Sequence, residues 1–283
     1  MKQLDSIAII GVGLIGASVG LAVRRCGLAH RVIGIGREGS RSLAEALRMG
    51  AISEGTSDIA AGVATADLTI VCTPVDTIAG YVQTALDAIP DRGLVTDAGS
   101  TKASILAKVA THPASARFIG SHPMAGSHLT GPENGHATLF DQRPVIVTPD
   151  NENSEAALEQ IEAFWQALGA QTLRLTPSEH DQAVAMISHL PHVVAAALAA
   201  NTPAEHLPLA SSGWADTTRI AAGDVQLWLQ ILNDNRDHVL KSLDKFGKVL
   251  TQFRDALATE DNDRLGELLQ AGKHTRDRME EQS

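Results

Sequence analysis

The segment 7–18, with the sequence IAIIGVGLIGAS, joins a short apolar run directly to the pattern Gly-x-Gly-x-x-Gly. In this pattern Gly11 permits a tight turn, Gly13 lets the backbone approach a pyrophosphate, and Gly16 lets the following helix lie close to its strand. The N-terminus of that helix offers free N–H groups and a positive dipole end to phosphates. Because the motif follows the first strand of the chain, it predicts a dinucleotide-binding domain rather than an ordinary glycine-rich turn.

Short apolar runs recur through the first part of the chain and are separated by segments of helical composition. The predicted strands are residues 31–36, 68–74, 93–97, 117–120, 144–147 and 172–175. Apolar strands that alternate with helices are typical of an α/β fold with a mostly parallel, doubly wound sheet of the Rossmann type. Ligands of such folds bind beyond the carboxyl ends of the strands, so the residues just after each strand are candidates for the site.

The pattern changes at Thr176, where the sequence TPSE has the form of a capping box with proline at the first helical position. Strand-like runs end there. We therefore predict a dinucleotide-binding domain over residues 1–175 and an all-helical substrate and dimerisation domain over residues 176–283. Pro191 is expected to kink the first long helix of the second domain. Apolar residues recur at three- and four-residue intervals over residues 243–257. This amphipathic face could close the core of a monomer or form a dimer interface, and we expect a homodimer.

Composition and charge argue against several classes of partner. The chain has a net charge of −10 and 3% aromatic residues, so it has neither the basic surface nor the stacking side chains of a nucleic-acid-binding protein. No apolar run approaches the roughly 20 residues needed to span a bilayer, so no membrane partner is expected. Cys26 and Cys72 lie in apolar segments and are predicted to be small buried thiols of a cytoplasmic protein. Their spacing fits no metal site, and no metal is expected.

The end of the second predicted strand bears on the choice of cofactor. Sites for NAD usually carry an acidic residue there, which binds the ribose 2'-hydroxyl. In this chain the position holds Gly36, followed by Arg37, Ser40 and Arg41. Glycine removes the carboxylate that would repel a 2'-phosphate, and arginine can pair with that phosphate, so NADP is predicted. There are two alternatives: the arginines are solvated surface charges, or Glu38 binds the ribose of NAD.

His122 is the candidate catalytic residue. It is predicted to lie at a strand end, in a loop facing the cofactor, where a neutral imidazole can accept a proton from a substrate hydroxyl. Ser100, just past the preceding strand, could donate a hydrogen bond to that ring. The alternatives are a structural histidine bonded to the backbone, and a serine that caps the helix beginning near Lys102.

The helical part contains a polar, glycine-interrupted segment at residues 211–220. Arg219 in this segment could bind a substrate carboxylate through two hydrogen bonds, or could instead form an ion pair with Asp216. His189 and His192 are three residues apart and could share one helix face. No further ligand cluster accompanies them, so a zinc pair is not expected.

Seven segments together resemble the prephenate/arogenate dehydrogenase family of tyrosine biosynthesis. They are GVGLIGAS (11–18), CTP (72–74), TDAGSTK (96–102), GSHPMAG (120–126), DQAV (181–184), ISHLP (187–191) and DTTRI (216–220). They run in order over most of the chain, which makes the resemblance far more specific than the glycine motif alone. It implies an enzyme that oxidises a cyclohexadienol ring with loss of CO2, giving tyrosine from arogenate or 4-hydroxyphenylpyruvate from prephenate.

The resemblance also implies roles for single residues. His122 would accept the proton of the ring hydroxyl, with Ser100 as its hydrogen-bonding partner. The substrate-binding residues that it implies are Arg219, His189, Ser121 and Gly126. The predicted cofactor-binding residues are Gly11, Gly13, Leu14, Ile15, Gly16, Gly36, Arg37, Ser40, Arg41, Cys72, Thr73 and Pro74.

Substrate and cofactor choice stay open between close alternatives. The end of the second strand resembles the NADP-preferring, arogenate-using members, whereas His192 after Pro191 occurs in some prephenate-using relatives. We expect NADP, with arogenate favoured over prephenate; NAD with prephenate is the alternative. Enzymes acting on 3-hydroxyacids rely on a lysine at the start of their helical domain, and this chain has no lysine between Lys108 and Lys241. A non-catalytic NADP-sensing protein is the alternative from another class.

Overall fold

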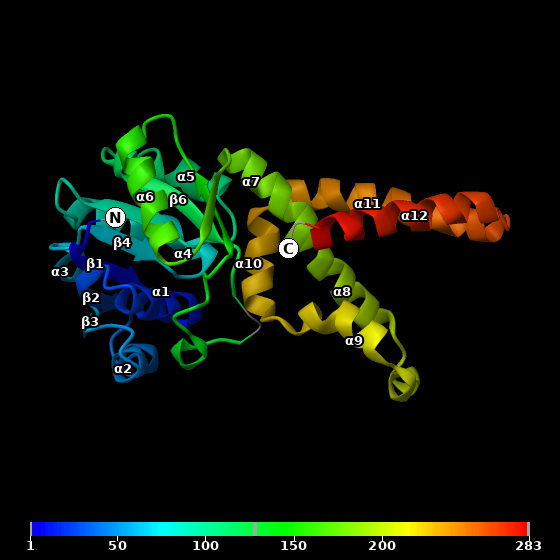
Figure 1. The fold of residues 1–283 in the computed structure, drawn as a ribbon, viewed down its shortest axis with the longest axis horizontal. Coiled ribbons are helices and arrows are strands. Elements are labelled where there is room, and N and C mark those ends of the chain that lie inside the picture. Colours follow the sequence, from blue (N-terminus) through cyan, green and yellow to red (C-terminus); the bar gives the residue numbers. More distant parts are fainter. Residues whose placement is uncertain (1, 127–128, 282–283) are drawn as a thin grey trace. The chain divides into compact units, whose positions relative to one another are not determined.

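The computed structural model describes residues 2–126 and 129–281. The chain divides into two compact units, Met1–Arg236 and Asp237–Ser283, each described by itself. The first contains an eight-stranded sheet, the helices that cover it and a further group of helices (Figure 1). The second contains α11 (Arg236–Ala258) and α12 (Asn262–Glu281). The predicted domain boundary after residue 175 lies inside the first unit and stays a prediction.

The sheet is mostly parallel and doubly wound, as expected. Its strand order is β3-β2-β1-β4-β5-β6-β7-β8, and the pairing of β6 with β7 is antiparallel. The chain winds outward from β1 to β3 on one side and from β4 to β8 on the other, so the switch point at which dinucleotides bind lies between β1 and β4. The strands are β1 (Leu4–Ile10), β2 (Ala29–Ile35), β3 (Glu54–Thr56), β4 (Leu68–Val71), β5 (Leu94–Asp97), β6 (Phe118–Pro123), β7 (Pro144–Thr148) and β8 (Gln171–Arg174).

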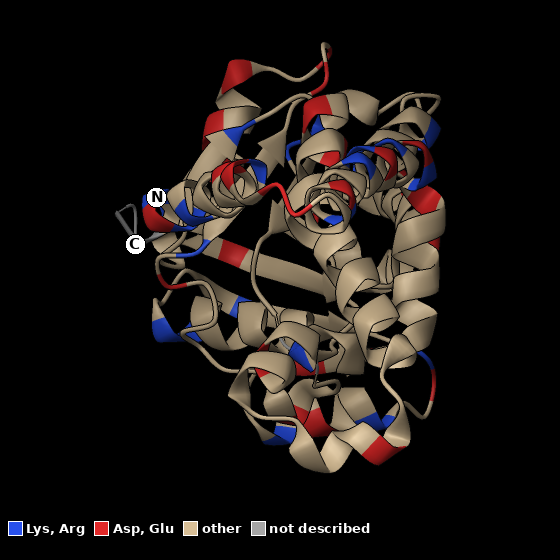
Figure 2. Ribbon diagram, turned by 90° about the vertical axis from the view of Figure 1, so that its right-hand side faces the viewer, with Lys and Arg blue, Asp and Glu red and all other residues tan. Residues whose placement is uncertain are grey.

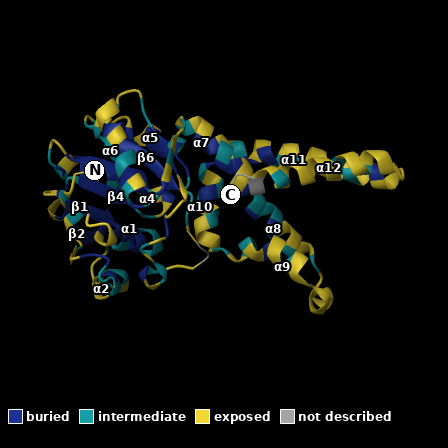
Figure 3. Cartoon of the chain, viewed as in Figure 1, coloured by how far each residue is buried: buried dark blue, intermediate teal, exposed yellow. Residues whose placement is uncertain are grey.

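Side chains of the central strands alternate between two apolar layers. Ile7 and Ile9 of β1 belong to a buried cluster with α1 and α6, whereas Ala8 and Ile10 belong to a second cluster with α4 and α5. This alternation is that of a strand covered on both faces, and Figure 3 shows the strands as the most buried part of the fold. The helices of this part are α1 (Leu14–Arg25), α2 (Arg41–Arg48), α3 (Ile59–Val63), α4 (Val75–Ala88), α5 (Ala103–Val109) and α6 (Glu155–Ala167), with the 3-10 turns η1 (Ser115–Arg117) and η2 (Pro132–Asn134).

The chain after β8 is helical, as predicted. The Thr176 hydroxyl accepts the Glu179 N–H, and the Glu179 carboxylate accepts the Thr176 N–H, so the predicted capping box is present. The elements are α7 (Pro177–Val184), the π-helix η3 (Ala185–His189), α8 (Leu190–Asn201), the 3-10 turn η4 (Ala204–Leu209), α9 (Ser212–Thr218), the 3-10 turn η5 (Arg219–Ala222) and α10 (Val225–Asp234).

A π-helical turn interrupts the helix that runs from α7 into α8, just before Pro191. The π-helix η3 ends at His189, and Pro191 lies in the first turn of α8. Proline lacks an N–H group and its ring presses against the carbonyl four residues earlier, so a wider preceding turn accommodates it. Single π turns of this kind often occur at functional sites.

The same helix corrects the prediction about apolar runs. The segment Pro177–Asn201 has a mean hydropathy of 1.7 over its most apolar stretch and is long enough to cross a membrane, with 33% of that stretch buried. One such helix is weak evidence for a membrane span, because core helices have the same composition. This helix also carries the buried polar residues His180, Asp181, His189 and His192.

Three further details differ from the prediction. The short edge strand β3 was not predicted, because its three residues, EGT, carry no apolar pattern. Cys26 is exposed at the C-terminal end of α1 and is not a buried thiol, while Cys72 is half-buried. His122 lies within β6, which extends to Pro123, and not in the loop after it.

Acidic and basic residues are interspersed along the helices (Figure 2).

Candidate active site

The glycine turn between β1 and α1 has the geometry of a pyrophosphate cradle. Gly11 has a φ of +90°, and a Cβ on Gly16 would lie 2.1 Å from the Gly11 carbonyl oxygen, so the helix packs on the turn only without a side chain there. A Cβ on Gly13, by contrast, would meet nothing within 4 Å. Gly13 is the N-cap of α1 and no side chain caps the helix. The N–H groups of its first turn, which includes Leu14 and Ile15, therefore fit a phosphate ligand.

Two loops lie next to this turn. The segment 72–74 joins β4 to α4, and its Cys72 N–H donates to the Ile10 carbonyl at 2.7 Å. A Cβ on Gly11 would lie 2.9 Å from the Cys72 carbonyl oxygen, so Cys72 and the glycine turn are in close contact. A Cβ on Gly126 would lie 3.8 Å from Ile15 Cδ1, which places the loop after β6 beside the first turn of α1.

The loop after β2 carries free positive charge. Gly36 is half-buried, and its N–H donates to the Thr56 carbonyl at 3.1 Å. Arg37 and Arg41 are exposed, and neither guanidinium forms an ion pair or hydrogen bond with any described side chain. Ser40 is the N-cap of α2, and Arg41 is its first residue. Two unpaired arginines therefore lie at or just before a helix N-terminus.

His122 lies on a strand that is paired on both sides. His122 itself pairs with Ile146 of β7. The first residues of β6 pair with β5 on the other side. Because β6 runs parallel to β5, His122 lies toward the carboxyl edge of the sheet, where the glycine turn also lies. Its side chain is 8% exposed. A strand held in this way gives the imidazole a more precise position than a loop would.

A chain of hydrogen bonds links the His122 ring to a carboxylate. His122 Nδ1 lies 2.8 Å from His180 Nε2, and His180 Nδ1 lies 2.7 Å from Asp181 Oδ1. A carboxylate only accepts hydrogen bonds, so His180 carries its proton on Nδ1 and its Nε2 accepts. His122 must then carry its proton on Nδ1. Its Nε2 is left as a bare acceptor, which is the form that a general base needs.

The environment keeps these histidines neutral. Burial holds the pKa of His122 well below its usual range, and the nearby charges of His180, Lys102 and His189 act in the same direction. Burial also lowers the pKa of His180, against the opposing effect of Asp181. Burial tends to raise the pKa of Asp181, but the hydrogen bond from His180 and those from two backbone N–H groups outweigh it and lower the pKa. The aspartate is thus ionised beside two neutral imidazoles.

Asp181 also caps the helix that follows β5. Its two oxygens accept the N–H groups of Lys102 and Ala103 at 2.8 and 2.9 Å. Asp234 of α10 accepts from the hydroxyl of Thr101 at 2.5 Å and from that of Ser104 at 2.7 Å. The Asp181 carboxylate thus satisfies free N–H groups at the N-terminus of α5, where a negative charge also suits the helix dipole. Hydrogen bonds therefore join the start of α5 to Asp181 of α7 and to Asp234 of α10.

These contacts bear on the two serines predicted for the site. Ser100 is half-buried, and its hydroxyl makes no hydrogen bond to a described residue. The interpretation of Ser100 as a helix cap is wrong, because Asp181 is the cap. His122 Nδ1 is bonded to His180, so a role for Ser100 toward the other ring nitrogen stays a prediction. Ser121 is fully buried, with its hydroxyl 2.7 Å from that of Thr96, and contact of Ser121 with substrate likewise stays a prediction.

His189 has the opposite tautomer from His122. Asn235 donates its Nδ2 hydrogens to the Asp181 carbonyl at 2.7 Å and toward His189 Nδ1 at 3.2 Å. A neutral His189 then carries its proton on Nε2 and presents an N–H donor. Burial lowers the pKa of His189 to about 4. The site thus holds one imidazole that accepts a proton and one that donates a hydrogen bond.

The Trp228 indole separates His189 from His192. The His192 ring stacks on it with centroids 3.5 Å apart, and the His189 ring meets it edge-on at 6.1 Å. His192 is buried, and its Nδ1 has no partner among the described residues. Over the described part of the chain, no three His, Cys, Asp or Glu side chains are placed to hold a metal ion.

Arg219 begins the turn η5, directly after α9, and is exposed. Among the described residues it forms no ion pair, so the alternative of a salt bridge to Asp216 is not what the structure shows. An exposed guanidinium without a partner is available to bind a carboxylate bidentately.

The buried histidines predict acid sensitivity of the fold. His122, His180 and His189 all have lowered pKa values in the folded protein. Their stabilising effect is complete above the unfolded pKa of about 6.5 and is lost as the pH falls toward the folded values, because the unfolded chain binds protons first. For His189, whose pKa is about 4, the loss is about 2 kcal/mol at pH 5 and reaches about 3 kcal/mol only below about pH 4. Urea unfolding at about pH 7.5 and pH 5 measures it. Equal free energies of unfolding at both pH values would contradict this prediction. His30→Asn, at an exposed histidine, is the control and should show the same pH dependence of unfolding as the wild type.

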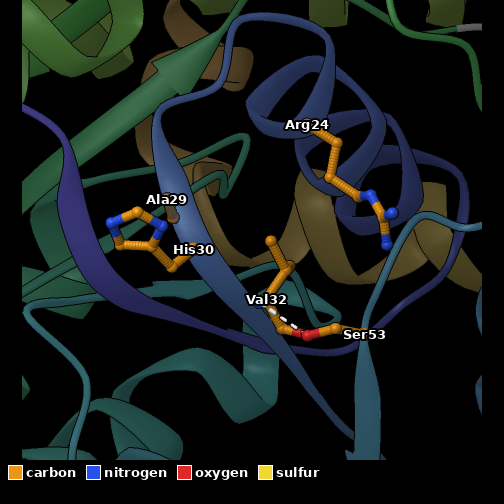
Figure 4. A pocket seen from close by; sticks show the side chains of 5 residues that line it. All are labelled: Arg24, Ala29, His30, Val32 and Ser53. Carbon is orange, nitrogen blue, oxygen red and sulfur yellow. Dashed lines mark hydrogen bonds between the residues drawn. The ribbon is translucent and has the colours of Figure 1, made fainter.

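A cavity elsewhere in the fold is not part of this site. It has a volume of about 270 Å³ and is lined by Arg24, Ala29, His30, Val32 and Ser53 (Figure 4). These residues lie at the end of α1, the start of β2 and the segment before β3. The cavity is therefore at the amino end of β2, whereas the glycine turn and His122 lie at the carboxyl edge of the sheet.

Sequence reasoning missed several members of the site. His180, Asp181 and Asn235 orient the two imidazoles, and Lys102 supplies a buried charge, yet the sequence assigned none of them a role. Asp181 and Lys102 fall inside segments that carried the family resemblance, which was the one available signal. Asn235 lies outside them, at the end of α10.

Comparison with known proteins agrees with this geometry. The family model for the nucleotide-binding domain of prephenate dehydrogenase matches residues 19–174, and the model for its dimerization domain matches residues 176–271. The prephenate dehydrogenase of Bacillus subtilis strain 168 is 34% identical, with 98% of this chain and 77% of that protein covered.

Two solved structures have the same fold. A prephenate dehydrogenase from Aquifex aeolicus, in complex with hydroxyphenyl propionate and NAD+, superposes with a TM-score of 0.89 at 28% identity, covering 97% of this chain and 98% of that chain. Synechocystis arogenate dehydrogenase superposes with a TM-score of 0.81 at 32% identity, covering 97% and 99%. The chain therefore belongs to the prephenate dehydrogenase family, whose members are NAD(P)-dependent oxidoreductases.

Proposed function

We propose that this enzyme catalyses the oxidative decarboxylation of arogenate, and also accepts prephenate, with NADP as the preferred cofactor. The observation that carries the proposal is the hydrogen-bonded chain from Asp181 through His180 to His122, which leaves His122 Nε2 as a proton acceptor. A non-catalytic sensor of NADP would gain nothing from a neutral base held in this way. Membership of the family supports the reaction class, oxidative decarboxylation with a nicotinamide cofactor.

In the proposed mechanism His122 Nε2 accepts the proton of the ring hydroxyl. The bound nicotinamide supplies the acceptor for the hydride that leaves the same carbon. His180 and Asp181 hold the imidazole in the tautomer and orientation that the proton transfer needs. The ring carboxylate then leaves as CO2 and the ring becomes aromatic, which makes the reaction effectively irreversible. The protein has mainly to position the ring and keep His122 neutral.

Two groups are proposed to hold the substrate. Arg219 is an exposed, unpaired guanidinium suited to a carboxylate. His189 presents an Nε2–H donor, because Asn235 occupies its other nitrogen. A charged and a neutral donor together suit a small substrate that carries a carboxylate and a further oxygen.

The preference for NADP rests on the loop after β2. Gly36 places no carboxylate where a 2'-phosphate would lie, and Arg37 and Arg41 have no competing partner among the described residues. The Aquifex relative was crystallised with NAD+, and we propose that the present chain instead prefers NADP. The resemblance of the same loop to arogenate-using members, and the likeness to the Synechocystis enzyme, favour arogenate.

Substitution of Arg37 tests the cofactor proposal. Arg37→Gln removes a charge-assisted contact to the 2'-phosphate, which is worth about 1.5–3 kcal/mol. We expect the KM for NADP to rise about 10-fold or more while the KM for NAD stays within about two-fold. Steady-state kinetics with both cofactors measure this. Arg24→Gln, an exposed arginine at the far end of α1, is the control, and equal changes for both cofactors would contradict the assignment.

The reaction itself is tested by following reduced cofactor with each pairing of NAD or NADP with prephenate or arogenate. Fastest turnover with NADP and arogenate would support the whole proposal. Fastest turnover with NAD and prephenate would keep the role of His122 and overturn the interpretation of the β2 loop. No turnover with any pairing would leave the non-catalytic alternative.

We also propose a homodimer. Exposed apolar side chains lie on both helices of the second unit, among them Leu250, Leu257 and Leu269. The dimerization domain of the matching family supports this assembly. A cytoplasmic location, a small-molecule substrate, and no nucleic-acid or membrane partner complete the proposal.

A further inference from the structure

A fully buried ion pair lies beneath the proposed base. Lys102 and Asp97 are both 0% exposed, and the Lys102 ammonium pairs with Asp97 Oδ2. Removing two charges from water costs several kcal/mol per ion, and well-packed apolar residues would often stabilise a fold as well or better. The pair therefore calls for a reason other than stability.

Asp97 binds the backbone of β6 next to His122. Its Oδ1 accepts the Ser121 N–H at 3.0 Å, and its Oδ2 accepts the Gly99 N–H at 2.9 Å. Ser121 directly precedes His122 in β6. The carboxylate at the end of β5 thus fixes the strand position from which the imidazole projects.

Lys102 belongs to the other support as well. Its backbone N–H donates to Asp181 Oδ1 at 2.8 Å, and the same oxygen accepts from His180 Nδ1. His180 in turn contacts His122 Nδ1. The contacts therefore close into a ring that runs from the Lys102 ammonium through Asp97, Ser121, His122, His180 and Asp181 to the Lys102 backbone.

We propose that Lys102 is a positioning residue of the reaction, which ties together the two supports of His122 and fixes a positive charge beside its imidazole. This inference rests on the proposed role of His122 as the base. Lys102 does not bind substrate or cofactor itself, because its side chain is fully buried and its ammonium is engaged by Asp97.

The fixed charge has a definite chemical effect. Besides burial, which is the largest cause, the nearby charges of His180, Lys102 and His189 lower the pKa of His122. A cation nearby disfavours a second positive charge on the imidazole. Asp181 and Asp97 act on His180 in the opposite direction. Lys102 thus helps to keep His122 free of a proton when substrate arrives.

The test replaces Lys102 by glutamine, which can still donate a hydrogen bond to Asp97 but carries no charge. The acid limb of the pH dependence of kcat/KM reports the pKa of the free enzyme's base. In K102Q we expect this limb to move to higher pH, because the positive charge that lowers the pKa of His122 is removed. Lys108→Gln, an exposed lysine on the same helix, is the matched control and should leave the limb unchanged.

A second measurement separates this inference from the proposed function. The pKa of His122 is titrated directly in the free protein by NMR of 13C-labelled histidine, with His122→Asn identifying the signal. An upward shift in K102Q would support the inference even if no substrate were turned over. A folded K102Q protein with both the limb and the His122 pKa unchanged would overturn it.

If K102Q does not fold, the double variant D97N/K102Q removes the pair without leaving a lone buried charge. The pKa of His122 is expected to rise in this variant too, because the Lys102 charge that lowers it is removed. An unchanged His122 pKa in the folded double variant would count against the role of Lys102.

Discussion

Replacing His122 by asparagine should lower kcat by about 10²- to 10⁴-fold while the KM for substrate changes only a few-fold. The Asn Nδ2 can take the place of His122 Nδ1 and donate to His180 Nε2, so the strand and its support are preserved. What the variant lacks is any group at the position of Nε2. The loss therefore falls on the step in which the proton is taken, and not on substrate binding.

Steady-state kinetics with the best pairing of cofactor and substrate measure this effect. The control is His30→Asn, an exposed histidine on β2, which should keep wild-type kcat and KM. Thermal unfolding should show that H122N is folded. A loss shared equally by kcat and KM, or a kcat close to that of the wild type, would contradict the role of His122 as the base.

The sequence was sufficient for those features that depend on local pattern. The glycine turn, the parallel strands and the capping box at Thr176 each arise from residues close together in the chain, and each is found where it was predicted. The edge strand β3 was missed because its three residues form a strand only by pairing with β2, and their composition gives no strand signal. The apolar segment Pro177–Asn201 was missed because its polar residues interrupt the run in sequence.

The candidate site divides in the same way. His122 was predicted because a histidine at the end of a strand is a local signal. His180 is 58 residues further along the chain, and its contact with His122 depends on how α7 packs on the sheet. The carboxylates around the start of α5 are likewise distant in sequence: Asp181 accepts its N–H groups from α7, and Asp234 accepts the Thr101 hydroxyl from α10. The alternative for Ser100, a cap of the helix after β5, is wrong because the remote carboxylate of Asp181 occupies that place.

Asp181→Ala should have the largest effect on the fold. The Asp181 side chain is almost fully buried and accepts three hydrogen bonds, from His180 Nδ1 and from the backbone N–H groups of Lys102 and Ala103. Alanine would leave all three donors buried without an acceptor. Each such group costs about 1–3 kcal/mol, and the three are not additive. We expect the free energy of unfolding to fall by about 3–5 kcal/mol.

The same substitution should impair catalysis in the molecules that remain folded. Without the carboxylate, His180 is free to carry its proton on Nε2, where it would no longer accept from His122. The His122 tautomer with a bare Nε2 is then no longer enforced, and kcat should fall about 10-fold or more. Urea unfolding and steady-state kinetics measure the two losses, with Asp91→Ala, an exposed aspartate in the turn before β5, as the control. A stable variant with normal kcat would show that neither the helix cap nor the histidine pair depends on Asp181. A destabilised variant with normal kcat would confine Asp181 to the fold and leave the orientation of His122 to other contacts.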